Sequence, residues 1–397
     1  MNTDRPVIRL LPKTDPRRVR RGFPWVYANE LVTDRRTKAL APGTIARLED
    51  GERRALGTVA VNPNSKIIAR VLDHDADAEI NADWLRTRVK AALVLREQLY
   101  DAPFYRLIHA EADGMPGVVV DRFGDALVIQ PNAAWADVLF DDIANTLTEL
   151  TGATAVVKNA SGRARSLEGL DEGVDVVRGT LDAPVPVPMN GASYMADLTG
   201  GQKTGLFFDQ RPNHAFVARF SKDARVLDVF SHVGGFALAS LAAGAKEALA
   251  VDGSQAALDL AEAGAAQSGV AAKFKTLKSD AFAALTQLAE EGASFEVVVC
   301  DPPAFAPNKG ALDAGLRAYE KVARLSAPLV AKGGTLTLCS CSHAADLTQF
   351  RSACLRGIGR AGRQAQLLRT GYAGPDHPMH ASLAESGYLK ALTFRLT

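Results

Sequence analysis

From about residue 213 to its end, the sequence alternates short apolar runs with stretches that have a helical pattern. The runs read RVLDVF, EALAVD, KFKTLKSD, FEVVVCD and GTLTLCS, and helices are expected over residues 235–243, 254–268, 281–290, 312–330 and 344–359. This alternation predicts βαβ units, whose parallel strands form one sheet covered by helices on both faces. Ligand sites in such sheets lie at the carboxyl ends of the strands, so the residues that end each run are the first candidates for a site.

The ends of the first three predicted strands indicate a nucleotide site. Gly234 and Gly235 stand where the first strand turns into a helix, and glycines there let backbone N–H groups approach a ligand, while Asp228 adds a carboxylate. Asp252 ends the next strand, where a carboxylate typically holds ribose hydroxyls. The pattern is not G-x-G-x-x-G, so a smaller adenosine-containing ligand, with its amino group near Asp280, is favoured over a dinucleotide. Ordinary βα connections with scattered aspartates are the alternative.

The fourth predicted strand ends in CDPPAF, which indicates a site for a planar base. Asp301 can hydrogen-bond a base edge, and Phe305 can stack on its face. Pro302 and Pro303 stiffen the loop and remove donors from it. A plain rigid turn is the alternative.

The fifth predicted strand ends in SCSH, and its Cys341 suits one difficult reaction. Carbon 5 of a pyrimidine is a poor nucleophile until a thiolate adds at carbon 6 and generates an enamine. Cysteine fits because it is appreciably ionised near neutrality and can also leave. Cys339 and Cys354 are interpreted as packed thiols. Packing would also explain Cys341 on its own, but the neighbouring Asp-Pro-Pro loop and adenosine site favour catalysis.

The N-terminal part is basic, although the net charge of the whole chain is only +1. Residues 1–75 contain 15 Lys and Arg against 9 Asp and Glu. A cluster of arginines is followed by aromatic residues at alternate positions: Arg17, Arg18, Arg20, Arg21, Phe23, Trp25 and Tyr27. Such a surface can bind RNA phosphates and stack on bases, or it can be a solvated charged face beside a small core. Both interpretations stay open on the cluster alone.

Length and composition bound the class of protein. A chain of 397 residues is too long for one ordinary core, and 47% hydrophobic with 23% charged residues is typical of a soluble globular protein. No signal peptide or membrane span is visible, and four cysteines without disulfide or C-x-x-C spacing predict a reducing cytoplasm and no metal site. Residues 1–75 have the short apolar runs of a β-rich module, a helix is expected to about residue 100, and the Pro-rich segment 182–191 is expected to be an extended link or edge.

Motifs over nearly the whole chain carry a family resemblance: RVRRGFPWVYANEL, EADGMPGVVVDRFGD, GGQKTGLFFDQRPN, VLDVFSHVGGFAL, CDPPAFAPNK, SCSH and PDHP. With them the chain resembles the bacterial large-subunit (23S) rRNA cytosine-5 methyltransferases, which are class I S-adenosylmethionine-dependent enzymes with an N-terminal PUA domain. The resemblance implies an α/β fold class with a PUA RNA-binding domain over 1–75, a central α/β domain over 76–190 and a Rossmann-like methyltransferase domain over 191–397 that ends in an antiparallel strand.

The resemblance also implies roles for individual residues. Cys341 matches the nucleophile and Asp301 the base-site aspartate. Cofactor-binding positions are Asp228, Phe230, Ser231, Gly234, Gly235, Asp252, Asp280, Phe208, Gln210 and Arg211. Substrate-binding positions are Pro302, Pro303, Phe305, Lys309, Arg20 and Arg21. The segment 203–211 is expected to close over cofactor and substrate. Ala304 departs from the lysine, and His214 from the arginine, that relatives often have.

The resulting expectation is a cytoplasmic enzyme that methylates carbon 5 of a cytosine in large-subunit rRNA, naked or in a ribosomal particle, with S-adenosylmethionine as cofactor. No membrane partner is expected, and homodimer formation is left open. One rival is direct methylation of another base such as guanine, for which Cys341 would be dispensable. A second rival is a non-catalytic RNA-binding or ribosome-assembly factor, which the departures at Ala304 and His214 keep open.

Overall fold

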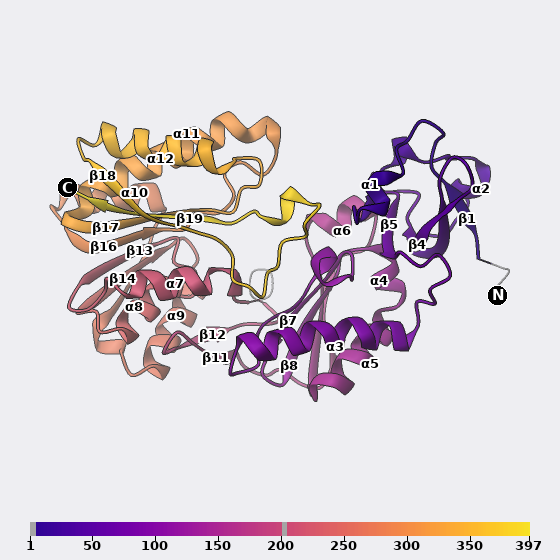
Figure 1. The fold of residues 1–397 in the computed structure, drawn as a ribbon. Coiled ribbons are helices and arrows are strands. Elements are labelled where there is room, and N and C mark those ends of the chain that lie inside the picture. Colours follow the sequence, from indigo (N-terminus) through magenta and orange to yellow (C-terminus); the bar gives the residue numbers. More distant parts are fainter. Residues whose placement is uncertain (1–4, 201–204) are drawn as a thin grey trace. The chain divides into compact units, whose positions relative to one another are not determined.

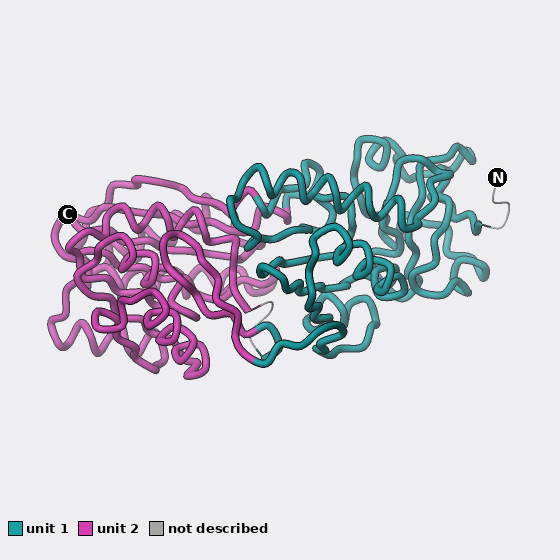
Figure 2. The backbone as a smooth tube through the Cα atoms, turned by 90° about the horizontal axis from the view of Figure 1, so that it is seen from below, with its two compact units in different colours: residues 1–182, 198–204, 376–384 teal, residues 183–197, 205–375, 385–397 magenta. Residues whose placement is uncertain are grey.

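The computed structural model describes residues 5–200 and 205–397 of the chain. The chain divides into two compact units, each made of several stretches of sequence (Figure 2). Unit 1 contains residues 1–182, 198–204 and 376–384, and unit 2 contains residues 183–197, 205–375 and 385–397. Within the described ranges, no helix is long and apolar enough to cross a membrane.

The first part of unit 1, drawn in indigo in Figure 1, is a small five-stranded sheet in the order β1-β3-β4-β5-β2. Its elements are β1 (Val7–Arg9), α1 (Arg17–Arg20), β2 (Trp25–Val26), α2 (Arg35–Lys38), β3 (Thr44–Glu49), β4 (Ala55–Val61) and β5 (Ala69–Asp73). Apolar side chains such as Ile8, Leu48 and Val59 are at most 1% exposed and form its core. The prediction of a β-rich module in this part is confirmed.

The second part of unit 1 is a five-stranded sheet in the order β10-β9-β8-β7-β6. Its strands are β6 (Phe104–His109), β7 (Val118–Phe123), β8 (Ala126–Pro131), β9 (Ala155–Ala160) and β10 (Gly173–Arg178). Its helices are α3 (Ala82–Leu99), α4 (Ala134–Val138), α5 (Phe140–Thr151) and α6 (Arg163–Glu168). Helices α3 and α5 contact each other and share one apolar core with the sheet, and Asn81 caps α3 by accepting from Trp84 N at 3.1 Å.

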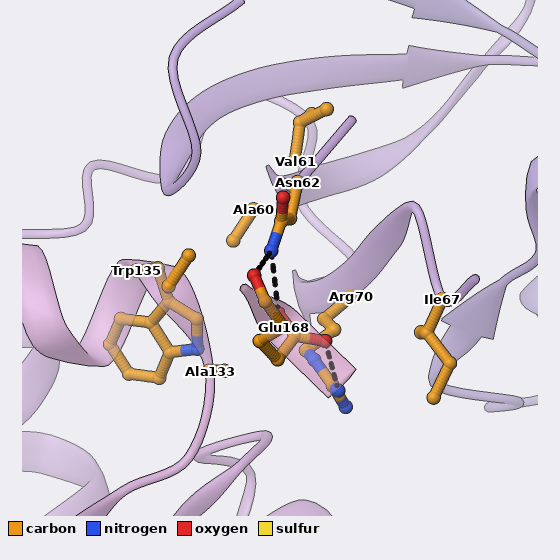
Figure 3. Close-up of a pocket in the computed structure, with 9 residues that line it drawn as sticks. Ala60, Val61, Asn62, Ile67, Arg70, Ala133, Trp135 and Glu168 are labelled. Atoms are coloured by element: carbon orange, nitrogen blue, oxygen red, sulfur yellow. Dashed lines mark hydrogen bonds and ion pairs between the residues drawn. The ribbon is translucent and has the colours of Figure 1, made fainter. Parts of the chain in front are cut away.

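A buried carboxylate links the two sheets of unit 1 (Figure 3). Glu168, at the end of α6, accepts from Asn62 Nδ2 at 3.0 Å, Ser65 Oγ at 2.8 Å and Arg70 Nη2 at 2.9 Å. Glu168 is 3% exposed, and a charge buried to this extent is tolerated only when it is paired and hydrogen-bonded. Since its oxygens are occupied by protein donors, we assign this cluster a role in stability rather than in ligand binding.

Unit 2 is built on a seven-stranded sheet in the order β15-β14-β13-β16-β17-β19-β18. Its strands are β13 (Arg225–Val229), β14 (Glu247–Asp252), β15 (Phe274–Lys278), β16 (Phe295–Cys300), β17 (Val330–Ser340), β18 (Ala365–Gly371) and β19 (Lys390–Leu396). Strands β13 to β17 are parallel, and β19 runs antiparallel to both of its neighbours. The predicted parallel sheet and the antiparallel last strand are therefore confirmed.

Helices cover both faces of this sheet. They are α7 (Arg211–Ala218), α8 (Gly235–Ala242), α9 (Gln255–Gln267), α10 (Ala281–Glu290), α11 (Leu312–Ser326) and α12 (Leu347–Arg360). Helices α7 to α9 lie on one face and α10 to α12 on the other (Figure 1). The Pro-rich segment forms a two-stranded hairpin of β11 (Val185–Met189) and β12 (Ala192–Ala196), so it is extended, as predicted.

The sheet order places the predicted site at one edge. The chain order reverses between β13 and β16, and open α/β sheets bind ligands at such a point. Strands β16 and β17 are neighbours, with Cys300 opposite Leu338, so the segments that follow them start side by side. The domain boundary predicted at 75–76 falls between the two sheets of unit 1, and the one at 190–191 falls in the turn between β11 and β12. Both boundaries stay predictions.

Candidate active site

The turn between β13 and α8 has an unusual backbone. Phe230, His232 and Gly234 have φ angles of 62°, 49° and 80°. Left-handed conformations of non-glycine residues cost of order 1–3 kcal/mol each and cluster at ligand sites. Gly235 is restricted in another way, because a Cβ atom there would lie 2.7 Å from His214 Nε2. The predicted cofactor turn is thus strained and closely packed.

Asp228 lies beneath this turn and is fully buried. Its Oδ2 accepts from the N–H groups of Phe236 at 3.1 Å and Ala237 at 2.9 Å, in the first turn of α8. Burial raises the pKa of Asp228 from 3.8 to about 7, although both N–H groups favour the charged form. The carboxyl group therefore titrates near neutrality. Its other oxygen, Oδ1, has no hydrogen-bond donor among the described residues.

This titration predicts a pH dependence of stability. The folded ligand-free protein holds a proton on Asp228 up to about pH 7, whereas the unfolded chain releases it near 3.8. Because the folded state binds more protons in this window, its free energy of unfolding falls as pH rises through it, by at most ~4 kcal/mol. Asp228→Asn is expected to lack this component. Urea unfolding of the wild type and of Asp228→Asn between about pH 4 and pH 7 measures this component. If the free energies of unfolding of the two proteins change in parallel with pH, the prediction is contradicted.

The next two strand ends hold their carboxylates through backbone donors. Asp252 Oδ2 accepts from His232 N at 2.9 Å, and its Oδ1 accepts from Ser254 N at 2.8 Å. Asp280 is exposed and caps α10 by accepting from Ala283 N at 3.0 Å. Asp252 is therefore fixed beside the strained turn. Asp280 caps α10, and its side chain is otherwise exposed to solvent.

Several buried polar atoms in this region have no hydrogen-bond partner among the described residues. They include Asp228 Oδ1, Ser231 Oγ and Asp209 Oδ1. Native proteins leave few buried polar groups unpaired, and each such group calls for an explanation such as a ligand. The donors and acceptors around the turn therefore suit a polar, adenosine-containing ligand.

The segment before α7 is held within unit 2. Phe208 and Gln210 belong to a 3-10 helix (Phe208–Gln210) and are buried, and the Arg211 guanidinium lies 5.3 Å from the Phe208 ring. Asp209 accepts from Tyr388 Oη at 2.5 Å. Lys203, at the start of the segment predicted to close over the ligands, lies outside the described residues. The closing role of this segment stays a prediction.

The two serines of SCSH fix the backbone on either side of Cys341. Ser340 Oγ donates to Tyr319 Oη at 2.9 Å, and Tyr319 Oη lies 2.8 Å from Ser342 Oγ. Ser342 Oγ also accepts from Ala306 N, in the loop after β16, at 3.0 Å. Both serines are fully buried, whereas Cys341 between them is partly exposed. The motif therefore ties the nucleophile candidate to α11 and to the Asp-Pro-Pro loop.

The other three cysteines are fully buried or nearly so: Cys300, Cys339 and Cys354. Burial raises the pKa of the Cys300 thiol to about 12 and that of Cys339 well above its usual value. Such thiols stay protonated near neutrality and are poor nucleophiles. The interpretation of Cys339 and Cys354 as packed thiols agrees with this burial.

The Asp-Pro-Pro loop has one buried and one exposed side. Asp301 is partly exposed, Pro302 is buried and Pro303 is exposed. The Phe305 ring is half-buried, with its centroid 5.0 Å from that of Tyr319. Lys309 is exposed at the start of a 3-10 helix (Lys309–Ala311). Asp301 is thus partly exposed and Pro303 exposed to solvent, while Phe305 is in contact with protein rings.

Two residues of this site were missed from the sequence. Tyr319 bridges the serines from α11, and Lys390 of β19 is 5% exposed and donates to Ser342 O at 2.7 Å and Ala345 O at 2.8 Å. Neither stands in a local motif. Lys390 reaches the site because it pairs antiparallel with Ser340, which stands 50 residues earlier in the sequence. Of the predictions from sequence, only that of an antiparallel last strand pointed toward this pairing.

The basic cluster lies in unit 1, and most of its arginines have protein partners. Arg20 Nη2 donates to Asp50 Oδ2 at 2.7 Å. Arg18 stacks on the Phe23 ring at 3.7 Å. Arg21 is exposed and forms no ion pair within the part of the chain that the structure describes. Of the two predicted RNA contacts, Arg21 is therefore the one whose charge is available.

Comparisons with known proteins agree with this geometry. A family model described as a PUA-like domain matches residues 8–74, and one described as an S-adenosylmethionine-dependent methyltransferase matches residues 139–361. Ribosomal RNA large subunit methyltransferase I of Aeromonas salmonicida is 33% identical over 94% of this chain and 96% of its own. The protein of the same name from Alteromonas mediterranea is 33% identical over 98% of each chain.

Solved structures share the fold. A putative methyltransferase from Streptococcus mutans has a TM-score of 0.81 at 17% identity and covers 98% of this chain and all of its own. A putative methyltransferase complexed with SAH has a TM-score of 0.82 at 18% identity, over 98% of this chain and 99% of its own.

Proposed function

We propose that this chain, which belongs to the family of S-adenosylmethionine-dependent ribosomal RNA large subunit methyltransferases with an N-terminal PUA-like domain, methylates carbon 5 of a cytosine in large-subunit rRNA. The observation that carries the proposal is the placement of Cys341. It is the partly exposed thiol among four, it lies at the carboxyl end of β17, and its flanking serines are bonded to α11 and to the Asp-Pro-Pro loop.

The predicted fold class, an α/β methyltransferase domain preceded by a PUA-like domain, and the predicted dependence on S-adenosylmethionine are both confirmed by the family matches. We propose that Asp228, Ser231, Gly234, Asp252 and Asp280 hold this cofactor. The unpartnered Asp228 Oδ1 and Ser231 Oγ support the assignment, because a ligand with amino and hydroxyl groups would satisfy them. When bound, S-adenosylmethionine supplies an electrophilic methyl group.

Cys341 makes carbon 5 of the base reactive toward that methyl group. Its thiolate sulfur forms a bond to carbon 6, and the electron pair of the carbon 5–carbon 6 double bond moves onto carbon 5. After methylation the proton on carbon 5 passes to water or a basic side chain, the double bond forms again, and Cys341 leaves as a thiolate. Lys309 and His343 are both exposed near these loops and are the candidates for accepting the proton.

The Asp-Pro-Pro loop orients the base in this proposal. Asp301 hydrogen-bonds the polar edge of the cytosine, and Pro303 with the exposed part of Phe305 contacts its face. A base can reach Cys341 only when it is out of its stack, so the target nucleotide is single-stranded or flipped.

The identity of the modified nucleoside tests the proposal. Total rRNA from a strain that lacks this gene is incubated with the protein and methyl-labelled S-adenosylmethionine, then digested to nucleosides. Label in 5-methylcytidine is expected. Label in a guanine nucleoside would replace the cytosine assignment with direct transfer to another base, and absence of label on rRNA and on ribosomal subunits would favour a non-catalytic binding factor.

Charge reversal at Arg21 is expected to weaken RNA binding. An exposed arginine that contacts a phosphate releases a counterion, so Arg21→Glu should lower affinity several-fold and reduce the slope of log K against log salt by about 0.9. Lys246→Glu is the control, since Lys246 is exposed just before β14, at the edge of the sheet opposite the strand ends. Equal losses in both variants, measured by RNA titration at several salt concentrations, would contradict a specific role of Arg21.

A further inference from the structure

Building on the covalent role proposed for Cys341, we propose that Lys390 is the positioning residue of this nucleophile: its buried ammonium group holds the loop 341–345 and stabilises the Cys341 thiolate. Lys390 touches the loop rather than the substrate, so its effect on the reaction passes through the state of the cysteine.

The sheet brings the two residues to the same edge. Lys390 is the first residue of β19 and pairs with Ser340, the last residue of β17. Because the two strands are antiparallel, β19 begins where β17 ends, directly before Cys341. The Lys390 Nζ atom then donates to Ser342 O at 2.7 Å and to Ala345 O at 2.8 Å, which fixes both ends of the turn that follows Cys341.

The charge of Lys390 is poorly compensated by the protein itself. Its side chain is 5% exposed, and lysines are almost never buried to this extent without an acidic partner. Within the described ranges, the acceptors of its ammonium group are the two carbonyl oxygens, which leaves one of its three N–H bonds available. A thiolate at Cys341 would supply the missing negative charge.

The groups around this pair set its electrostatics. Burial lowers the pKa of Lys390, and the nearby Cys341 and Asp346 oppose that shift. Asp346 is exposed and its carboxylate caps α12 by accepting from Gln349 N at 2.8 Å, which draws its charge toward the helix. The pKa of Tyr319, from α11, is raised by burial, so its phenol is neutral at physiological pH.

Further acidic and basic groups lie in the flanking segments. Asp301 follows β16 and opposes a thiolate, and His343 is exposed in the loop itself. The buried ammonium group of Lys390 therefore favours ionisation of Cys341, whereas the carboxylates of Asp301 and Asp346 oppose it.

The reactivity of Cys341 toward iodoacetamide tests the role of Lys390 without RNA or methyl transfer. Only the thiolate is alkylated, so the rate rises with pH as Cys341 ionises. Lys390→Met removes the charge but keeps the length of the side chain. We expect alkylation at neutral pH to be about tenfold slower in this variant, with the midpoint of the rate profile moved to higher pH by about one unit and equal rates at high pH. Cys341→Ser gives the background from the buried thiols.

Two further variants separate charge from packing. Lys332→Met makes the same substitution at an exposed position of β17, far along the strand, and should leave the profile unchanged. Lys390→Arg keeps the charge and should keep the wild-type midpoint. A profile of Lys390→Met that coincides with wild type, or a midpoint that moves as far in Lys390→Arg as in Lys390→Met, would overturn the proposal. Failure of the covalent mechanism would instead appear as methyl transfer that survives Cys341→Ala, whatever the alkylation profile.

Discussion

Cys341→Ala is expected to abolish methyl transfer, with a loss of about three orders of magnitude or more in kcat, while the affinity for S-adenosylmethionine stays unchanged. In the proposed mechanism the thiolate is needed only to activate carbon 5, so its removal should take away an interaction of the transition state and leave cofactor binding intact. Single-turnover transfer of labelled methyl to rRNA measures the first quantity, and calorimetric titration of the cofactor measures the second.

Cys354→Ala is the matched control for this substitution. Cys354 lies in α12, is fully buried and belongs to the core cluster of unit 2. Its replacement should cost about 1 kcal/mol of stability through a small cavity and leave the rate of transfer unaffected. Transfer that persists in Cys341→Ala would make the SCSH motif a packing feature and move the assignment to a base methylated directly.

Much of this site was predictable because the relevant signals are local. A polar residue directly after an apolar run marks a strand end, and parallel strands bring successive ends to one edge of the sheet. This reasoning makes Asp228, Asp252, Asp301 and Cys341 candidates without knowledge of any contact, and their roles stay predictions. The proposed role of Cys341 also needs β16 and β17 to be neighbours, and the structure pairs them directly.

The missed residues depend on contacts between distant parts of the chain. Lys390 reaches the loop after Cys341 only because β19 returns antiparallel beside β17. The residues around Lys390 in the sequence form no motif that would predict a site. Arg20 also depends on a distant contact, because its partner Asp50 lies 30 residues away. Without knowledge of this ion pair, the sequence predicts that the charge of Arg20 is available for RNA. His377 of the PDHP motif is 4% exposed and lies in unit 1, with its ring 5.0 Å from that of His109.

Gly235→Ala is expected to destroy most cofactor affinity, by about 100-fold, and to lower the free energy of unfolding by about 1–3 kcal/mol. The added Cβ would lie 2.7 Å from His214 Nε2 and 2.8 Å from His214 Cε1, which is closer than Cβ atoms are found in proteins. His214 is 4% exposed, and its ring is 4.4 Å from that of Phe236 and 6.3 Å from that of Tyr194, so it has little room to move. The φ angle of Gly235 is outside the left-handed region, so the predicted loss comes from this contact alone.

The cost of the contact can be isolated by removing its other partner. His214→Ala leaves a cavity beneath the turn, and Gly235→Ala placed in that background should cost at least about 1 kcal/mol less than it does in wild type, because the cavity accepts the new methyl group. Gly359→Ala, where an added Cβ meets nothing within 4 Å on α12, controls for glycine replacement in a helix and should be neutral or stabilising by up to about 1 kcal/mol. Urea unfolding and cofactor titration of the four variants measure the cycle. The contrary result is that Gly235→Ala lowers the free energy of unfolding and the cofactor affinity equally with and without the His214 ring. In that case the packing of the ring does not shape the predicted cofactor turn, and the histidine that replaces arginine at position 214 does not hold the turn.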